Sequence, residues 1–438
     1  MKQKNVDEIL EEFDKKCKKL EITFNKELEQ NITYYKEIEE NLKYCIERDD
    51  FLTKNFLEKS YMMKRTFHPV GHGGFYSEEF KNFKLVYDCG SKSSLRVKEV
   101  IKNNFTKDET IDILFISHFD SDHVNGIPAL NEHCNIKQVV MPLLHENTKI
   151  ALTKLYKIYE PSLVSLIENP KEFFGENTKI IYVKPNNEDN NRIDLQRIDP
   201  QPIELETITD DLEIDSNTIL KSQKVSMNNW IFIPYNDEHK DRKKELKKIF
   251  DEFTIDIEKL EKDSNYTLKM IDIDSKKTLK YKEKFKKIYD RLTKKINENS
   301  MLLYSGRDIT TVSAKLKKKS LEELMIGDRV ASLYTGDSNL NKINIKEIFN
   351  PYWGNIGTIQ IPHHGSKHNF NENILSDDKS YYCPISVPNE STNHPNIQVT
   401  ESIQNNNSIP LNITYDEDEI LQELRNKLDC WKKVKELL

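Results

Sequence analysis

The segment from Ile113 to His123 constrains this chain more than any other, because an apolar run ends in a dense set of potential metal ligands. Its sequence is Ile-Leu-Phe-Ile-Ser-His-Phe-Asp-Ser-Asp-His. A short apolar run of this kind is typical of a buried strand. His118, Asp120, Asp122 and the terminal His would then lie on a loop just beyond a rigid element. Imidazole suits zinc and carboxylates suit harder ions such as manganese, so the segment predicts a divalent-metal site, with two ions of Zn or Mn.

The pattern His-x-Asp-x-Asp-His at residues 118–123 resembles the signature of the metallo-β-lactamase fold superfamily, whose commoner form is His-x-His-x-Asp-His. Asp120 stands where the second His of that signature usually lies. This variant is similar to the hydrolase domain of competence-type DNA-uptake proteins, and also to bacterial phosphorylcholine esterases. A polar loop that is rich in Asp and His by chance is the alternative interpretation.

Four further parts of the chain fit this resemblance in the expected order, between about residues 62 and 410. They are an opening hairpin with an Asp-x-Gly turn (68–74 and 85–90), an Asn-x-x-Ser strand (297–303), a Thr-Gly-Asp strand end (333–337), and a Pro-His-His-Gly-Ser loop (361–366) with His-Pro after it (394–395). Their joint order is more specific than any one of them. It implies an α/β fold, the αββα sandwich of the metallo-β-lactamase type.

The resemblance also implies a metal ligand set. The matched ligands are His118 and Asp120 for the first ion, Asp122, His123 and His364 for the second ion, and Asp337 as a bridge between the two. Many members supply a further His to the first ion, but no His lies between His239 and Asp337. Asn297, His239 or another residue would fill that place. An amide oxygen suits manganese better than zinc, so the predicted first site is rich in oxygen, and occupancy by a single ion stays open.

The same resemblance assigns catalytic and substrate-binding residues. Asp122 would orient the nucleophile, and His363 would face the substrate and stabilise or protonate a leaving oxygen. Substrate contacts are assigned to Ser366, Lys367, Asn369 and His394. Each of these four could equally be an ordinary polar residue of a surface loop.

These residues predict a metal-dependent hydrolase. A divalent ion lowers the pKa of bound water from 15.7 to about 7, and paired ions clamp the attacking and leaving oxygens of a phosphoryl centre. We therefore expect a phosphodiesterase or nuclease that cleaves nucleic acid or nucleotides by a metal-activated hydroxide. One alternative is a hydrolase of another ester, such as a phosphorylcholine ester, a lactone or a thioester. The other is a metal-stabilised interaction protein that acts through a helical arm, since one fold hosts many functions.

Three regions make up the predicted domain organisation. Residues 1–60 lack Pro and Gly, and apolar residues recur every three or four positions. This spacing predicts a long helix, either a coiled-coil arm for self-association or for a protein partner, or a helix folded back on the body. A catalytic domain at 61–410 and a C-terminal helix at 411–438 follow.

A charged helical insertion is expected within the catalytic domain, at about 236–296. Residues 240–296 contain 19 Lys and Arg against 12 acidic residues. Such a segment is either a helical face exposed to solvent or a binding surface for an anionic polymer. The second alternative follows because basic patches attract phosphate backbones.

Bulk composition favours a cytoplasmic enzyme. The net charge of −7 argues against general affinity for nucleic acid. No apolar run approaches the ~18 to 20 residues that cross a bilayer, and no signal-peptide pattern occurs, so we expect no membrane partner. The six Cys residues are scattered without a Cys-x-x-Cys pair, which is typical of reduced thiols.

Overall fold

The structure, a computed structural model, describes part of the 438-residue chain. The described residues are 61–144, 149, 152–153, 156–157, 160–186, 201–225, 229–237, 248, 251–252, 300–308, 329–375, 379–389, 394–415 and 421–426. The chain divides into two units, residues 1–60 and 61–438, and every described residue belongs to the second. The predicted arm, nearly all of the predicted insertion, His239 and Asn297 lie outside the described residues.

The first of two large sheets has the strand order β11-β8-β7-β5-β3-β2-β1-β19. Its strands are β1 (Tyr61–Phe67), β2 (Phe75–Phe80), β3 (Phe83–Cys89), β5 (Ile113–Phe115), β7 (Gln138–Pro142), β8 (Lys179–Val183), β11 (Leu212–Ile214) and β19 (Leu421–Asn426). The strands from β3 to β11 run parallel, and the others pair antiparallel. All three residues of β5 are buried, as expected for a parallel strand covered on both faces.

The second sheet has the order β10-β12-β13-β14-β15-β16-β17-β18, with β9 paired to β13. Its strands are β9 (Pro185–Asn186), β10 (Ile203–Glu204), β12 (Leu220–Lys221), β13 (Trp230–Asp237), β14 (Leu302–Arg307), β15 (Ala331–Tyr334), β16 (Ile356–Ile359), β17 (Tyr382–Ser386) and β18 (Ile409–Ile413). The strands from β15 to β18 run parallel. A separate short pair is formed by β4 (Thr110–Ile111) and β6 (Asn135–Ile136).

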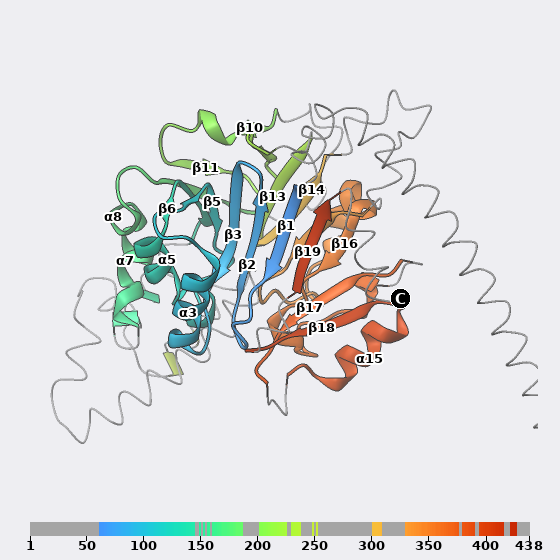
Figure 1. Cartoon of the computed structure of the whole chain (residues 1–438). Coiled ribbons are helices and arrows are strands. Elements are labelled where there is room, and N and C mark those ends of the chain that lie inside the picture. The colour runs from blue at the N-terminus through green and yellow to red at the C-terminus, as the bar shows by residue number, and fades with distance from the viewer. Residues whose placement is uncertain are drawn as a thin grey trace, which may run out of the picture. The chain divides into compact units, whose positions relative to one another are not determined.

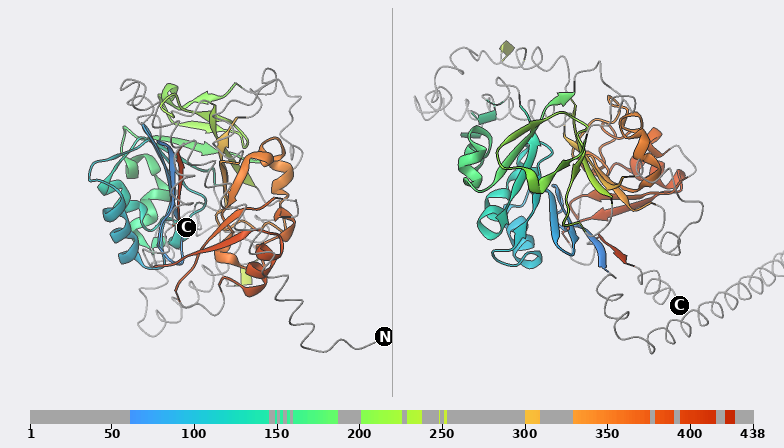
Figure 2. Two further views of the ribbon diagram at one scale, coloured as in Figure 1. Left: turned by 45° about the vertical axis from the view of Figure 1, so that its right-hand side comes forward. Right: turned by 90° about the horizontal axis from the view of Figure 1, so that it is seen from above.

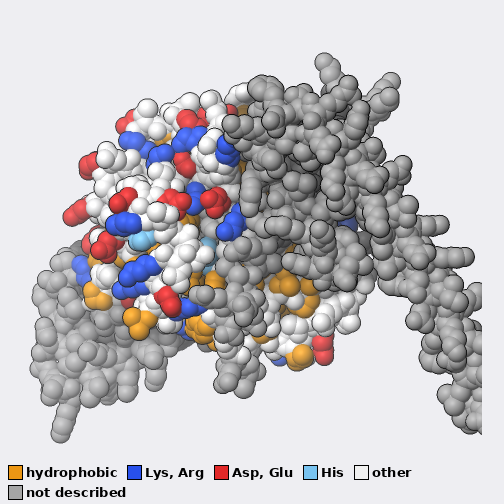
Figure 3. All heavy atoms as spheres, in the orientation of Figure 1, with side chains coloured by type: hydrophobic (Ala, Val, Ile, Leu, Met, Phe, Trp, Pro, Cys, Tyr) orange, Lys and Arg blue, Asp and Glu red, His pale blue; other side chains and the backbone are white. Residues whose placement is uncertain are grey.

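Helices cover the outer face of each sheet, so the described residues form four layers (Figures 1 and 2). The first sheet is covered by α3 (Ser94–Asn104), α5 (Ile127–His133), α7 (Val164–Glu168) and α8 (Pro170–Phe174), and the second by α14 (Ile345–Ile348) and α15 (Ile397–Asn405). The predicted αββα sandwich is thereby confirmed at the level of its layers. Figure 3 shows Lys and Arg side chains interspersed with Asp and Glu over the described part of one face.

An aromatic core and a buried ion pair join the two sheets. The Tyr87 and Tyr334 rings stack with centroids 4.9 Å apart. Beside them, the fully buried Glu78 carboxylate accepts hydrogen bonds from Arg65 Nε at 2.7 Å, Tyr334 Oη at 2.8 Å and Ser305 Oγ at 2.5 Å. These donors come from β1, β15 and β14, so one carboxylate links both sheets.

The C-terminal segment differs from the prediction of a helix at 411–438. Residues 409–413 form β18, and β19 at 421–426 pairs antiparallel with β1, with Phe67 opposite Leu421. The helical prediction was wrong there because the unpaired edge of β1 offers backbone hydrogen bonds that a local sequence pattern cannot reveal. Among the described residues, no helix is long and apolar enough to cross a membrane.

Candidate metal centre

The ligand-rich segment leaves the first sheet at the end of β5. Ile116 N donates to Val140 O at 2.9 Å, which extends the pairing of β5 with β7 by one residue. The chain then turns into the short helix α4 (Ser121–Val124), which carries Asp122 and His123, both buried. Its N-cap is Asp120, whose Oδ1 accepts a hydrogen bond from Ser121 N at 2.8 Å. The strand end and the helix thus fix the position of the motif.

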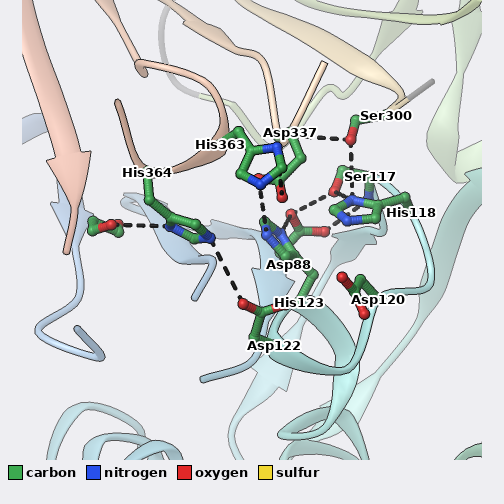
Figure 4. A network of polar contacts seen from close by, with 12 residues as sticks. Asp88, Ser117, His118, Asp120, Asp122, His123, Ser300, Asp337, His363 and His364 are labelled. Atoms are coloured by element: carbon green, nitrogen blue, oxygen red, sulfur yellow. Dashed lines mark hydrogen bonds and ion pairs between the residues drawn. The ribbon is translucent and has the colours of Figure 1, made fainter. Parts of the chain in front are cut away.

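One group of potential ligands consists of His118, His123 and Asp337. All three side chains are buried, and one ligand atom from each lies within 4.8 Å of the others (Figure 4). His123 Nε2 lies 3.2 Å from Asp337 Oδ1. Asp337 follows β15 of the second sheet, so this group forms where the two sheets meet.

A second group consists of His72, Asp122 and His364. The Nε2 atoms of the two His residues lie 3.4 Å and 3.6 Å from Oδ2 of Asp122. His72 comes from the glycine-rich loop between β1 and β2, and His364 from the short 3-10 turn η5 (His363–Gly365) after β16. Three separate parts of the chain therefore meet at this group.

Further side chains hold the imidazole rings in place. Asp88, at the end of β3, accepts hydrogen bonds from His123 Nδ1 at 2.8 Å and from Ser117 Oγ at 2.6 Å. Because Ser117 donates to the carboxylate, its 2.8 Å contact with His118 Nδ1 places the proton on that nitrogen. His364 Nδ1 donates to Ser386 O at 3.0 Å. In all three rings the Nε2 atom is therefore the one that faces its group.

The backbone is strained or crowded where it shapes the site. His363 and His364 adopt φ values of 49° and 55°, a left-handed conformation that is costly for residues with a Cβ. Gly74 packs so closely that a Cβ there would lie 2.5 Å from His123 Nδ1. Buried Gln360 accepts hydrogen bonds through Oε1 from Thr335 N and Gly336 N, each at 2.8 Å, which fixes the turn before Asp337.

The two carboxylates remain ionised despite their burial. Burial by itself raises the pKa of Asp337, but its interactions with His363, His123 and His364 outweigh burial and hold that pKa well below its usual range. Burial also opposes ionisation of Asp122, but the neighbouring His364 and His123 outweigh it and hold the pKa of this carboxylate below its usual range. Both groups can therefore offer a charged oxygen to a cation.

Burial favours the neutral form of three imidazoles, whereas His123 is charged. Burial lowers the pKa of His118 to about 3 and that of His72 to about 2, and burial also lowers the pKa of His363. Burial opposes protonation of His123 too, but Asp337 and Asp88 outweigh it and raise its pKa well above the usual value. A metal ion that binds His123 must displace this proton.

The donor set fits a divalent ion. His118 Nε2 is buried and has no hydrogen-bond partner among the described residues, while its Nδ1 is taken by Ser117 and Ser300. Each group combines two imidazoles with one carboxylate, and such nitrogen and oxygen sets bind zinc and neighbouring ions.

The residues that the sequence predicted as ligands converge, with one exception. The structure brings together His118, Asp122, His123, Asp337 and His364. It places Asp120 in neither group of the described residues. The partition also differs, because His123 lies with His118 and Asp337, and not with Asp122.

The other predicted catalytic and substrate-binding residues differ in burial and in their contacts with the centre. His363 and His394 lie at the edge of the centre, where their rings stack with centroids 6.3 Å apart. Asn369 is buried and donates from Nδ2 to Asp337 O at 3.0 Å, so it supports the ligand's backbone. Ser366 Oγ accepts from the backbone N of His368 at 3.3 Å. Lys367 is exposed.

Sequence reasoning gave no site role to His72, Asp88, Ser117 or Ser300. His72 carried a weak signal, a His within a glycine-rich loop of the opening hairpin. Asp88 was visible only as the Asp of the Asp-x-Gly turn. The two Ser residues act through contacts with His118, and no local pattern marks them.

Part of the chain matches the model of a known domain family. Residues 79–214 match the model of the metallo-beta-lactamase superfamily, and this range includes the motif at 118–123. No curated protein matches the chain. Among solved structures, the chain is similar to the metallo-beta-lactamase fold protein YhfI from Bacillus subtilis, with 8% identity and a TM-score of 0.36, over 82% of this chain and 99% of that one. It is also similar to a candidate metallo-beta-lactamase from Thermotoga maritima, with 13% identity and a TM-score of 0.19, over 29% of this chain and 61% of that one. The match at residues 79–214 supports a metallo-beta-lactamase superfamily domain in this part of the chain.

Proposed function

We propose that this protein is a metal-dependent hydrolase that cleaves phosphodiester bonds in nucleic acid or nucleotides. The observation that carries the proposal is the pair of adjacent His and Asp groups at the meeting of the two sheets. Domains of this superfamily are generally hydrolytic. When bound, two divalent ions would supply an activated water at neutral pH and neutralise charge that develops on a phosphodiester.

The side chains of the centre would have different roles in the reaction. The predicted ligands that converge, His118, His123, Asp337, Asp122 and His364, would hold the ions. Asp122 is suited to orient the attacking water, because its carboxylate is ionised and faces the space between His72 and His364. Its burial, with 8% of the residue exposed, keeps competing solvent away from this oxygen.

His363 is suited to the leaving side of the reaction. Its side chain is 27% exposed, and its Nδ1 lies 3.8 Å from Asp337 Oδ2. Burial lowers the pKa of this ring, so it is neutral at physiological pH. A neutral imidazole is a weak acid but a good hydrogen-bond donor, which favours stabilisation of the leaving oxygen over full proton transfer. Together with His394, it gives the edge of the centre donors that suit a phosphate.

The test uses metal-free protein to which zinc or manganese is restored. Hydrolysis of bis(p-nitrophenyl) phosphate and of linear DNA is compared for the wild type, for Asp122→Ala and for Asp215→Ala, whose carboxylate is 84% exposed in a surface ion pair. We expect Asp122→Ala to lose ~3 orders of magnitude in rate on both substrates while the control retains activity.

Other outcomes assign the alternatives. Activity on the small ester alone would restrict the substrate to small phosphodiesters. No metal-dependent turnover of either substrate would disprove the proposal, and p-nitrophenyl phosphorylcholine, a lactone and a thioester would then be assayed. Full function of the Asp122→Ala variant in the cell would favour an interaction protein. In that alternative, the helical arm predicted at residues 1–60 would mediate self-association or bind a protein partner.

A further inference from the structure

We propose that His72 is a direct ligand of the second metal ion, so that the glycine-rich loop completes this site together with Asp122 and His364. The motif at residues 118–123 alone then supplies only part of each ion's protein ligands. The inference rests on the metal binding in the proposed function, but not on the nature of the substrate.

The distances within the second group support direct coordination. Ligands at ~2.0 to 2.1 Å from a tetrahedral ion lie about 3.3 Å from one another. His72 Nε2 and His364 Nε2 lie 3.4 Å and 3.6 Å from Oδ2 of Asp122. By contrast, His123 Nδ1 lies 2.8 Å from the Asp88 carboxylate, the spacing of an ordinary hydrogen bond. His72 therefore has the spacing of a fellow ligand of Asp122, rather than that of a hydrogen-bonded support.

Both rings of the group point their Nε2 atoms at the same oxygen. The rings of His72 and His364 have centroids 3.8 Å apart. His364 is held by the hydrogen bond from Nδ1 to Ser386 O, which leaves its Nε2 for the ion. Two imidazole nitrogens and one carboxylate oxygen form three of the four ligands of a tetrahedral site, and the fourth position is left for water or substrate.

The loop of His72 is fixed to the same elements that carry the other ligands. Lys92 N donates to His72 O at 2.8 Å, and Gly74 N donates to Asp122 O at 3.0 Å. Gly90 N in turn donates to Gly74 O at 2.8 Å. These bonds hold the loop against α4 before any ion binds, so little ordering entropy opposes coordination by His72.

The decisive measurement is metal content and affinity, without substrate. Zinc per chain is measured after equilibrium dialysis, and zinc titration is followed by calorimetry, for the wild type, His72→Ala and His394→Ala. His394 is the matched control, because its ring lies 6.1 Å from that of His72 at the edge of the same centre but belongs to neither ligand group. We expect His72→Ala to lose one zinc ion per chain, or to bind it at least ~10-fold more weakly, and His394→Ala to bind as the wild type does.

A second measurement uses only the wild type, in case His72→Ala does not fold. Modification of histidines by diethyl pyrocarbonate is mapped by mass spectrometry with and without zinc. We expect zinc to protect His72, while exposed His368 reacts equally in both states.

The proposal is overturned if His72→Ala folds and binds as many zinc ions as the wild type with the same affinity, or if zinc leaves the modification of His72 unchanged. A protein that binds zinc through His72 but hydrolyses no phosphodiester would disprove the proposed function and leave this inference intact.

Discussion

His123 donates a hydrogen bond from Nδ1 to Oδ2 of Asp88 at 2.8 Å, and this contact decides which nitrogen of His123 faces the candidate metal centre. Its other nitrogen, Nε2, is thereby turned toward Asp337 Oδ1 at 3.2 Å. Asp88 is fully buried and also accepts a hydrogen bond from Ser117 Oγ, and this hydroxyl in turn contacts Nδ1 of His118 and orients that ring. One carboxylate thus positions two imidazoles of the first group.

Replacement of Asp88 by Asn should weaken metal binding without removing a ligand. The amide keeps the size of the side chain but loses the charge and one acceptor, so both rings are held less firmly. We expect zinc affinity to fall ~10- to 100-fold, as measured by competition with a chelating dye. Asp112→Asn is the control, because Asp112 is also buried but pairs with Lys224 at 2.7 Å. Equal zinc affinity in Asp88→Asn and the wild type would contradict this role.

Asp120 provides a test between the structure and the family resemblance. The resemblance implies a ligand of the first ion, whereas the structure uses this carboxylate as the N-cap of α4. We expect Asp120→Ala to bind as many zinc ions as the wild type, and to lose only about 0.5 to 2 kcal/mol of stability from the missing cap. Loss of one zinc ion per chain from this variant would show that Asp120 is a ligand after all.

Removal of the Glu78 carboxylate should destabilise the sandwich strongly. Glu78→Ala leaves the buried Arg65 guanidinium without its carboxylate, and also removes the acceptor of Tyr334 and Ser305. We expect a loss of about 3 to 5 kcal/mol in the free energy of unfolding, measured by urea titration. Neighbouring Glu79 is the matched control, since its side chain is 52% exposed and its replacement by Ala should cost less than about 0.5 kcal/mol. Similar losses in the two variants would refute the role of the buried pair.

His68 should make the protein sensitive to acid. Burial, aided by the charges of Lys64 and Lys84, lowers the pKa of His68 to about 3, against about 6.5 in an unfolded chain. Above pH 6.5 the ring is neutral in both states, and its contribution to stability is fully present there. As the pH falls from 6.5 toward 3, the unfolded state binds the extra proton, and stability is lost at about 1.4 kcal/mol per pH unit.

The variant His68→Gln removes this titration. Urea unfolding of metal-free protein at pH 7.5 and 5.0 should show that the variant loses about 2 kcal/mol less than the wild type on acidification. The charges of the metal-site histidines affect both proteins alike and cancel in the comparison. A difference between the two proteins that does not change with pH would contradict a neutral buried His68.

Part of this fold could be predicted from the sequence, because buried strands and metal-binding side chains produce recognisable local patterns. A parallel strand that is covered on both faces must be apolar throughout, so β5 was readable from Ile113 to Phe115. The potential ligands at the end of this strand are close to one another in the sequence. The motif at 118–123 could therefore be recognised without knowledge of the distant residues that lie beside it in the fold.

Tertiary structure alone decided how these ligands are grouped. His123 lies with Asp337 and not with Asp122, because its Nδ1 donates to Asp88, a residue 35 positions earlier in the chain. The loop between β1 and β2 brings His72 to the second group. The pairing of β19 with β1 was equally hidden, since its partner edge lies more than 350 residues earlier in the chain. A local pattern records which side chains are buried and which can bind a metal. Contacts of 2.8 to 3.6 Å between distant segments determine which nitrogen meets which oxygen, and the chain makes these contacts only when it is folded.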